Sequence, residues 1–258
     1  MISPHVHIPF SRLAEHLDLI RKKSLNLELY FAGEVLDSLT LSDIRKTNEL
    51  LDHNPSLSFH APFMDLSPGA VDSLVREATM KRLSQILDVA EVLKPKAIVC
   101  HSGYEKWRYA LKPDWWLEMS LLTWQPINKR ASDMGVKLAI ENIFEDEPST
   151  LTMLMEHMNS DNFGICFDTG HCNLFSRVRL EDWMAALNPH IIELHLHDND
   201  RSSDQHLPVS EGTFDFSKFF HLLQNRDCIH TIEAHSPDKV MRSMEHIARF
   251  TKIAAGSS

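Results

Sequence analysis

Short apolar segments alternate with longer amphipathic segments along the whole chain. Apolar runs of about four to eight residues are typical of buried parallel strands, whereas longer segments with apolar positions three and four residues apart indicate helices. The pattern predicts strands at 4–8, 26–31, 57–60, 96–101, 136–141, 163–168, 190–195 and 229–233. It predicts helices at 11–23, 41–52, 70–93, 114–134, 148–159, 180–187, 215–225 and 237–253.

The order of these elements indicates the fold class. Eight strands, each followed by a helix, in a chain of 258 residues are typical of an α/β protein with a (β/α)8, or TIM, barrel. The alternative is an open doubly wound sheet, which usually has a glycine-rich turn after its first strand. This chain has 8 glycines and no GxGxxG motif. No linker divides it, so we expect residues 1–258 to form a single domain whose last few residues, AAGSS, are a disordered tail.

Six of the predicted strands end on a residue type that binds metal ions. These residues are His60, His101, Glu141, Asp168, His195 and Glu233. The residue directly before each of them is apolar, and successive strand residues point to opposite faces. The six side chains can therefore point into the barrel while their neighbours pack on the helices. Because barrel enzymes place their sites at the carboxyl ends of the strands, the pattern predicts a ring of ligands there.

Two loops add further candidates. The segment FDTGHCN places His171 three residues after Asp168, and a DQH triplet contains Asp204 and His206. Each of these residues alone is compatible with a hydrogen-bonded polar residue at the barrel rim. Their joint occurrence favours metal binding, because charges gathered at a barrel mouth cost free energy unless they are paired or bound to metal. Imidazole and carboxylate ligands suit Zn, Mn, Fe or Co, and the ligands suffice for one to three divalent ions per chain.

Other residues near these motifs are candidates for supporting roles. The inward parity of the strands, or proximity to a ligand, singles out His5, His7, Glu28, His197 and His235. We expect His197 to orient the ligands, since it lies two residues after His195 and on the same face. Cys172 follows His171 directly, but no base is assigned to activate its thiol, so we interpret it as a partly buried bystander.

Composition limits the partners and the compartment. The net charge of −10 disfavours a nucleic-acid partner, because phosphate binding usually needs a basic surface. No segment has the ~20 apolar residues of a membrane span, and the amino terminus does not resemble a secretory signal. The four cysteines form no CxxC pair, which is typical of reduced thiols, so we expect a cytoplasmic protein. The oligomeric state is open, and a homo-oligomer is compatible with the sequence.

The order of the motifs resembles a known family. HAPF, the histidine at 101, IEN, DTGH, LHLHD, DQHLP and a final glutamate follow one another as in the xylose isomerase-like TIM-barrel superfamily. That superfamily includes AP endonuclease family 2 and the sugar phosphate isomerases and epimerases. The resemblance covers roughly residues 57–235, and its most specific parts are DTGH and the DQH segment. The latter is followed by Ser210-Glu211-Gly212 in place of the family's GEG.

The resemblance implies a ligand assignment. In the endonuclease IV-like pattern of nine ligands, the first ion would be held by His60, His101 and the bridging Glu141. The second would be held by Glu141, Asp168, His195 and Glu233. The third would be held by His171, Asp204 and His206. The second set also resembles the single-metal site of the sugar epimerases, where the two glutamates take part in proton transfer beside a carbonyl. Glu141 and Glu233 are thus the implied catalytic residues.

Two chemistries remain open from the sequence. One is metal-assisted isomerisation or epimerisation of a small sugar or sugar phosphate, with proton transfer by the glutamates. The alternative is an endonuclease IV-like trinuclear-zinc phosphodiesterase, which the full ligand set favours. The acidic loop 145–147 and the few basic residues near the mouth favour the small substrate instead. A metal-binding scaffold without activity would be expected to lack ligands, and none is missing.

Overall fold

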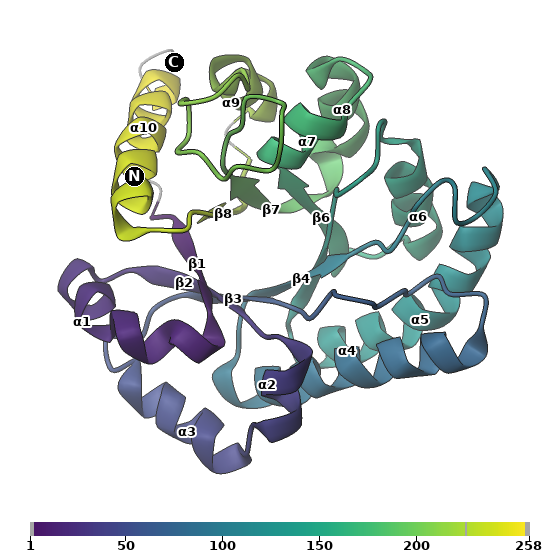
Figure 1. Cartoon of the computed structure of the whole chain (residues 1–258), viewed down its shortest axis with the longest axis horizontal. Helices are drawn as coiled ribbons and strands as arrows, with labels where there is room; N and C mark the ends of the chain where they lie inside the picture. Colours follow the sequence, from purple (N-terminus) through teal and green to yellow (C-terminus); the bar gives the residue numbers. More distant parts are fainter. Residues whose placement is uncertain (1–2, 225, 256–258) are drawn as a thin grey trace.

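Eight parallel strands close into a barrel in the computed structural model, which describes residues 3–224 and 226–255. The strands are β1 (His5–Pro9), β2 (Asn26–Tyr30), β3 (Leu57–His60), β4 (Ala97–His101), β5 (Lys137–Glu141), β6 (Phe163–Asp168), β7 (Ile191–Leu196) and β8 (Ile229–Ile232). Neighbouring strands pair in chain order, and β1 pairs with β8 to close the ring (Figure 1). The (β/α)8 barrel predicted from the sequence is confirmed.

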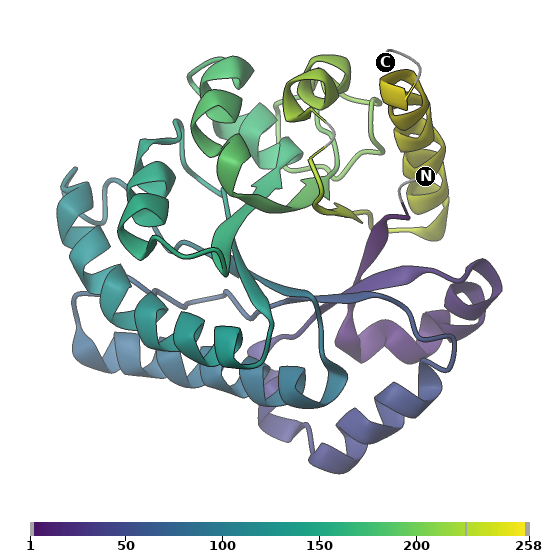
Figure 2. The same cartoon turned by 180° about the vertical axis from the view of Figure 1, so that it is seen from behind.

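Helices surround this barrel, as Figures 1 and 2 show from its two ends. They are α1 (Leu13–Lys23), α2 (Gly33–Ser38), α3 (Leu41–Leu50), α4 (Ser73–Leu93), α5 (Pro113–Asp133), α6 (Ser149–Met158), α7 (Thr169–Phe175), α8 (Leu180–Leu187), α9 (Phe216–Leu223) and α10 (Pro237–Ala255). Short 3-10 turns, η1 (Phe10–Arg12) and η2 (Asn188–His190), precede α1 and β7. The sequence pattern did not predict α2 and α7, because one or two turns are too short to show a helical period. No helix in the described part of the chain is long and apolar enough to cross a membrane.

Side-chain caps set the start of four helices. Thr40 caps α3, Asp72 caps α4, Asp168 caps α7 and Asp215 caps α9, each by accepting a hydrogen bond from a backbone N–H of the first turn. Such a cap stabilises a helix by about 1 kcal/mol. The cap of α7 lies at the end of β6, so the strand passes into the helix with no connecting loop. This arrangement fixes the DTGH segment against the barrel mouth.

The two faces of the strands separate into two environments. The residues before the strand-end candidates all belong to the main core between barrel and helices: Phe59, Cys100, Ile140, Phe167, Leu194 and Ile232. Inside the barrel, Val99, Ala139 and Cys166 form a separate small apolar cluster. The predicted parity of the strands is therefore confirmed, and the candidate ligands share the inner face.

The barrel interior is partly polar. Glu193 accepts hydrogen bonds from Ser58 Oγ (2.8 Å) and Thr231 Oγ1 (2.5 Å), and Ser58 Oγ also contacts His5 Nδ1 at 2.8 Å. Burial, reinforced by the negative charge of Glu28, raises the pKa of Glu193 to about 8. This carboxyl group is therefore mainly protonated at neutral pH, which lets it lie in the barrel without a cation.

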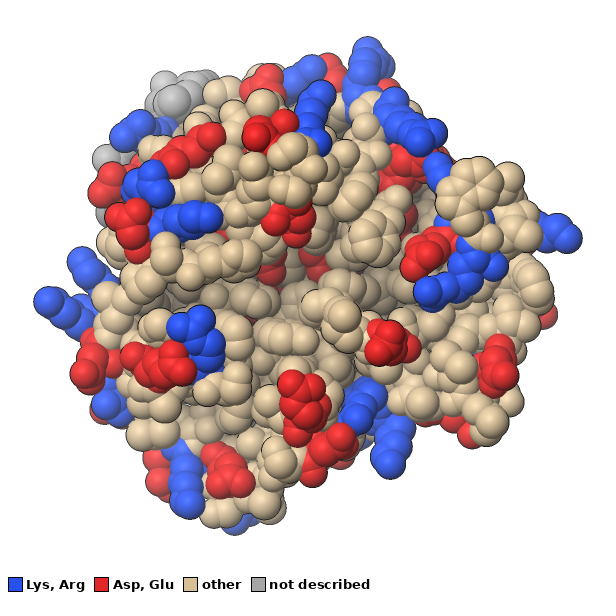
Figure 3. Space-filling view, viewed as in Figure 1, with Lys and Arg blue, Asp and Glu red and all other residues tan. Residues whose placement is uncertain are grey.

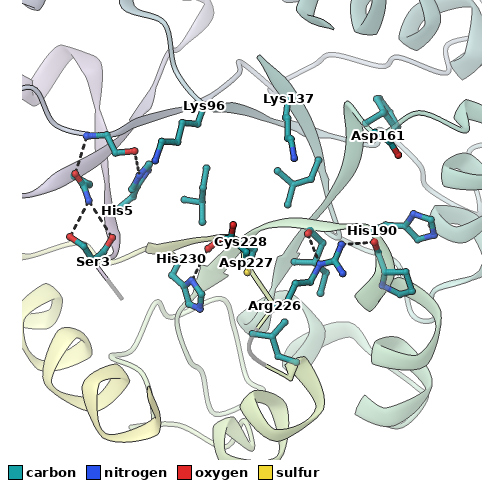
Figure 4. A pocket seen from close by; sticks show the side chains of 18 of the residues that line it. Ser3, His5, Lys96, Lys137, Asp161, His190, Arg226, Asp227, Cys228 and His230 are labelled. Carbon is teal, nitrogen blue, oxygen red and sulfur yellow. Dashed lines mark hydrogen bonds between the residues drawn. The ribbon is translucent and has the colours of Figure 1, made fainter. Parts of the chain in front are cut away.

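A cavity of 1260 Å³ opens at the amino-terminal end of the barrel (Figure 4). His5, Lys96, Lys137 and Arg226 are among the residues that line it. Arg226 is already engaged, since its Nε donates to Ile191 O at 2.8 Å. None of the nine candidate ligands borders this cavity. The expectation that His5 lines the candidate site is wrong, because the first residue of β1 lies at the opposite end of the barrel from the strand ends.

We predict that Glu193→Gln becomes progressively more stable than the wild type as pH rises from about 5 to about 8. An unfolded glutamate loses its proton near pH 4.3, whereas the folded carboxyl keeps it until about pH 8. Over that window the unfolded wild-type chain binds fewer protons than the folded one, so wild-type stability falls as pH rises, while glutamine does not titrate. Urea unfolding at several pH values measures the difference. Glu49→Gln makes the same substitution at an exposed position and serves as the control. A pH-independent difference for Glu193→Gln would contradict the prediction.

Candidate metal centre

All nine candidate ligands lie together at the carboxyl end of the barrel. A cavity of 1010 Å³ opens there, and seven of the nine border it: His60, His101, Glu141, His171, Asp204, His206 and Glu233. Asp168 and His195 lie deeper and are completely buried. Figure 3 shows the surface hollowed over the centre of the barrel, with acidic side chains at the floor of the hollow. The strand ends and two loops therefore converge as the sequence pattern predicted.

Glu141, the last residue of β5, is the centre of the cluster. One carboxylate oxygen, Oε2, lies 3.2 Å from both His60 Nε2 and His101 Nε2. The other, Oε1, lies 3.2 Å from both His171 Nδ1 and His195 Nδ1. Burial opposes ionisation, but these imidazoles hold the pKa of Glu141 well below its usual range. The carboxylate thus stands between two pairs of histidines.

A second group forms around His195 Nδ1. Besides Glu141 Oε1, this nitrogen lies 3.5 Å from Glu233 Oε1 and 3.7 Å from Asp168 Oδ2. Burial opposes ionisation of Asp168 as well, but the nearby His171 and His197 lower its pKa far below the usual value. Three carboxylates therefore converge on one imidazole nitrogen in a fully buried position, where negative charge is costly without a compensating positive charge.

The third group lies on the long loop between β7 and α9. Asp204 Oδ2 lies 3.0 Å from His206 Nε2 and 3.5 Å from His171 Nε2. His206 has a left-handed backbone (φ 45°), which asparagine, aspartate and histidine adopt more readily than most residues. The DQH triplet thereby brings both of its candidate ligands to the same side of the loop.

Asp198, just after β7, holds this loop in place. Its carboxylate accepts hydrogen bonds from the backbone N–H groups of Gly212 (2.9 Å), Thr213 (3.1 Å) and Phe214 (3.1 Å). A Cβ at position 212 would lie 2.3 Å from Asn199 O, so only glycine fits. The glycine of the SEG segment is thus explained by a close backbone approach.

His197, which we expected only to orient the ligands, lies in direct contact with three of them. Its Nε2 lies 3.0 Å from Asp168 Oδ2, its Nδ1 lies 3.6 Å from Asp204 Oδ1, and its ring stacks on His206 at 4.0 Å. Gly170 makes room for it, since a Cβ there would lie 2.1 Å from His197 Cε1. The same strand parity that singled out His195 could have placed His197 among the ligands.

The weaker candidates take different positions. Glu28 lies beneath the ring, where it accepts hydrogen bonds from His195 Nε2 at 3.0 Å and His7 Nδ1 at 2.7 Å. His235 stacks on the outer side of His206 with ring centroids 4.5 Å apart. Cys172 is buried, and burial raises its pKa to about 12. Its thiol is therefore neutral and unreactive, in agreement with its interpretation as a bystander.

Basic side chains near the mouth have partners within the chain. Lys106 Nζ donates to Asp146 Oδ2 at 2.5 Å, and Arg108 Nη2 donates to Glu105 Oε1 at 3.1 Å. Arg201 Nε donates to Asn173 Oδ1 at 3.1 Å. Aromatic rings line the same cavity, and Phe63 stacks on His101 at 4.2 Å. Phe63 and Met64 therefore form part of the cavity wall.

The histidines are oriented for a cation. His60 Nδ1 donates to Ala61 O at 2.9 Å, and His171 Nδ1 donates to Asn142 O at 3.1 Å. A neutral imidazole that donates through one nitrogen carries a lone pair on the other. The other nitrogens face Glu141 Oε2 and Asp204 Oδ2, which only accept, so a positive charge is needed between them, either a proton on the imidazole or a metal ion. A divalent ion between such groups would satisfy both, and the mixed N/O donor set suits Zn, Mn, Fe or Co.

Comparisons with known proteins agree with the fold and the motifs. Residues 27–250 match the family described as xylose isomerase-like TIM barrel. Over 227 residues the chain is 27% identical to the uncharacterized protein MJ1311 of Methanocaldococcus jannaschii, covering 83% of this chain and 77% of that relative.

Two solved structures are also similar. A D-tagatose 3-epimerase-like protein shares 23% identity with a TM-score of 0.80 and covers 98% of each chain. The TTHB071 protein of Thermus thermophilus, from a crystal soaked with ZnCl₂, shares 26% identity with a TM-score of 0.80, over 96% of this chain and 98% of that one. The resemblance drawn from the motifs is confirmed: the chain belongs to the xylose isomerase-like TIM-barrel family.

Proposed function

We propose that this protein is a divalent-metal-dependent enzyme that isomerises or epimerises a small sugar or sugar phosphate. The observation that carries the proposal is the position of Glu141 and Glu233. Both carboxylates border the same cavity, and they lie 3.2 Å and 3.5 Å from His195 Nδ1. Because one ends β5 and the other follows β8, they reach the cavity from different parts of the ring. A substrate carbon held between them would have a base on each face.

The ring would supply the ligands of the metal. When bound, a divalent ion supplies a Lewis acid that polarises a carbonyl and the hydroxyl beside it. The residues that would hold one to three such ions are His60, His101, Glu141, Asp168, His171, His195, Asp204, His206 and Glu233. The zinc-soaked structure of a relative with the same fold supports this part of the proposal.

The two glutamates would move the protons. Burial opposes ionisation of Glu233, but the nearby His195, His7 and His206 hold its pKa below the usual value, as imidazoles do for Glu141. Both groups are therefore carboxylates at neutral pH and can act as bases. Inversion of the carbon beside a carbonyl would require one carboxylate to remove the proton and the other glutamate, protonated from solvent before that step, to deliver a proton to the opposite face. Return by the same carboxylate to the neighbouring carbon isomerises the sugar.

The surroundings of the ring support a small substrate. The cavity is walled by Tyr30, Phe63 and Phe144, which can exclude water and pack on the apolar face of a sugar. The lysine and arginines described above are engaged by acidic or amide side chains, so they do not offer the row of phosphate contacts that a nucleic acid needs. A structure with the same fold that is described as D-tagatose 3-epimerase-like also favours sugar chemistry.

A second candidate function is an endonuclease IV-like phosphodiesterase. The observation in its favour is that all nine ligands of that pattern come together, with Glu141 between two groups of histidines. Three clustered ions would activate a water molecule and stabilise a leaving oxygen. The paired cations and acidic rim argue against a DNA substrate, and so we place this function second.

Purified protein grown in metal-replete medium should carry at least one equivalent of a divalent metal per chain. Buried imidazole lone pairs that face carboxylates are costly unless a cation lies between them. Elemental analysis measures the content, and less than one equivalent would contradict the proposal. One equivalent favours the isomerase or epimerase, whereas three favour the phosphodiesterase. Glu141→Gln should lower the content. Glu145→Gln should not, because that buried carboxylate is hydrogen-bonded to Ser102 and the Ile143 N–H instead of to the ring.

Glu233→Gln should reduce turnover by about 10²–10⁴-fold, the usual contribution of a general base, and leave the fold intact. A panel of ketoses and ketose phosphates in D₂O, followed by NMR, detects exchange of the carbon-bound proton together with product. Glu211→Gln is a matched control, since Glu211 pairs with Arg242 away from the ring. Full turnover by the Glu233 variant would show that this carboxylate does not transfer the proton.

The protein should neither bind nor cleave a duplex with an abasic site at physiological ionic strength. Its net charge is −10, and backbone contacts by basic residues supply most non-specific affinity for DNA. A mobility-shift assay and a nicking assay at several salt concentrations test this. Tight, salt-sensitive binding with strand cleavage would replace the sugar chemistry with the phosphodiesterase.

A further inference from the structure

His195 is the most deeply buried histidine among the candidate ligands, and its two ring nitrogens face different groups. Nδ1 faces Glu141, Glu233 and Asp168, at 3.2, 3.5 and 3.7 Å. Nε2 faces away from them and lies 3.0 Å from Glu28 Oε2. Both nitrogens face carboxylates, which only accept hydrogen bonds. A divalent cation among the three carboxylates would take the place of a proton on Nδ1, and Nε2 would keep the proton that it donates to Glu28. In the neutral ring Nδ1 is then left with its lone pair directed at the three carboxylates.

We propose that Glu28 is a positioning residue that holds His195 with Nδ1 available to a divalent cation. The inference rests on the proposed metal-dependent function. His60 and His171 are oriented by backbone carbonyls, as described above. His195 instead depends on a side chain from β2, 167 positions away in the sequence. A hydrogen bond from the second nitrogen of a ligating histidine to a carboxylate fixes the tautomer and the ring orientation, and makes the first nitrogen a better ligand.

The position of Glu28 supports this role more than a catalytic one. Its side chain is completely buried and does not border the cavity, so it does not contact a substrate there. Both of its oxygens are engaged, because Oε1 accepts from His7 Nδ1 at 2.7 Å while Oε2 accepts from His195. Its register neighbours are His7 on β1 and Ser58 on β3. The carboxylate is thus held on two sides by the strands of the barrel.

Glu28 also lies close enough to His7 and Glu233 to be considered a ligand itself, since one donor atom of each lies within 4.8 Å of the others. A positioning residue and a metal ligand respond differently to substitution by glutamine. A glutamine keeps an amide oxygen that accepts from Nε2, so it preserves a positioning role, whereas a neutral amide is a poor substitute for a ligating carboxylate. Leucine has a similar volume and removes the acceptor altogether.

The test is the metal affinity of the whole protein, stripped of metal and titrated with Zn²⁺ against a chromogenic chelator. We expect Glu28→Leu to raise the dissociation constant about 10–100-fold, the usual cost of losing such an orienting partner. Glu28→Gln should lose clearly less. Glu145→Gln is the matched control, because it changes another buried carboxyl group in the same way, one that is bonded to Ser102 and the Ile143 N–H and not to His195. It should bind like the wild type.

A second measurement does not depend on the stability of the leucine variant. With ¹⁵N-labelled histidine, long-range NMR correlations of the Zn²⁺-loaded wild type should show His195 protonated at Nε2, assigned by the loss of its signals in His195→Gln. Protonation at Nδ1 would overturn the inference. Equal affinity of the wild type and Glu28→Leu, or an equal loss in Glu145→Gln or Glu28→Gln, would also overturn it. A wild-type protein that binds no metal would instead remove the proposed function and this inference together.

Discussion

The convergence of buried carboxylates at one end of the barrel is the constraint on which the rest of the site depends. Glu141, Asp168 and Glu233 all lie within a few ångströms of His195 Nδ1. At such a buried position, like charges repel one another and desolvation opposes their ionisation. Each carboxylate is compensated by imidazoles, and their pKa values are lowered in spite of burial. Buried carboxylates therefore need histidines at the neighbouring strand ends. Removal of the carboxylate or of the imidazole would leave the other charge buried without compensation.

Hydrogen bonds hold the loops that carry the remaining candidate ligands in position beside the strand ends. Asp168 serves both as candidate ligand and as the cap of α7, so the strand end and the His171 segment cannot move independently. Asp198 gathers three backbone N–H groups of the returning loop and thereby positions the DQH triplet. Both oxygens of each of these two aspartates have hydrogen-bond partners, and such buried bonds favour one arrangement of the chain. Hydrogen bonds therefore hold the floor of the site, where the proposed metal binding and proton transfer depend most on geometry.

Polar character runs from the middle of the barrel to its mouth. The neutral carboxyl group of Glu193 bonds to Ser58 and Thr231. The Glu28 carboxylate, towards the mouth, bonds to His7 and His195. An apolar interior would pack as well, but it could not hold the imidazole of His195 in one tautomer. In the proposed role of Glu28, the interior thus contributes to the orientation of the ring.

Much of this protein could be predicted from its sequence. The alternation of short apolar and long amphipathic segments indicated the barrel, because buried parallel strands and surface helices bury their side chains with different periods. Strand parity placed His60, Glu141 and the other strand-end residues on the inner face, because that parity is local to each strand. Only the tertiary structure decided that His197 contacts Asp168 and that Glu28 accepts from His195. Those contacts join strands far apart in the chain, and they depend on how the closed barrel staggers its strands and on the rotamers that packing then permits.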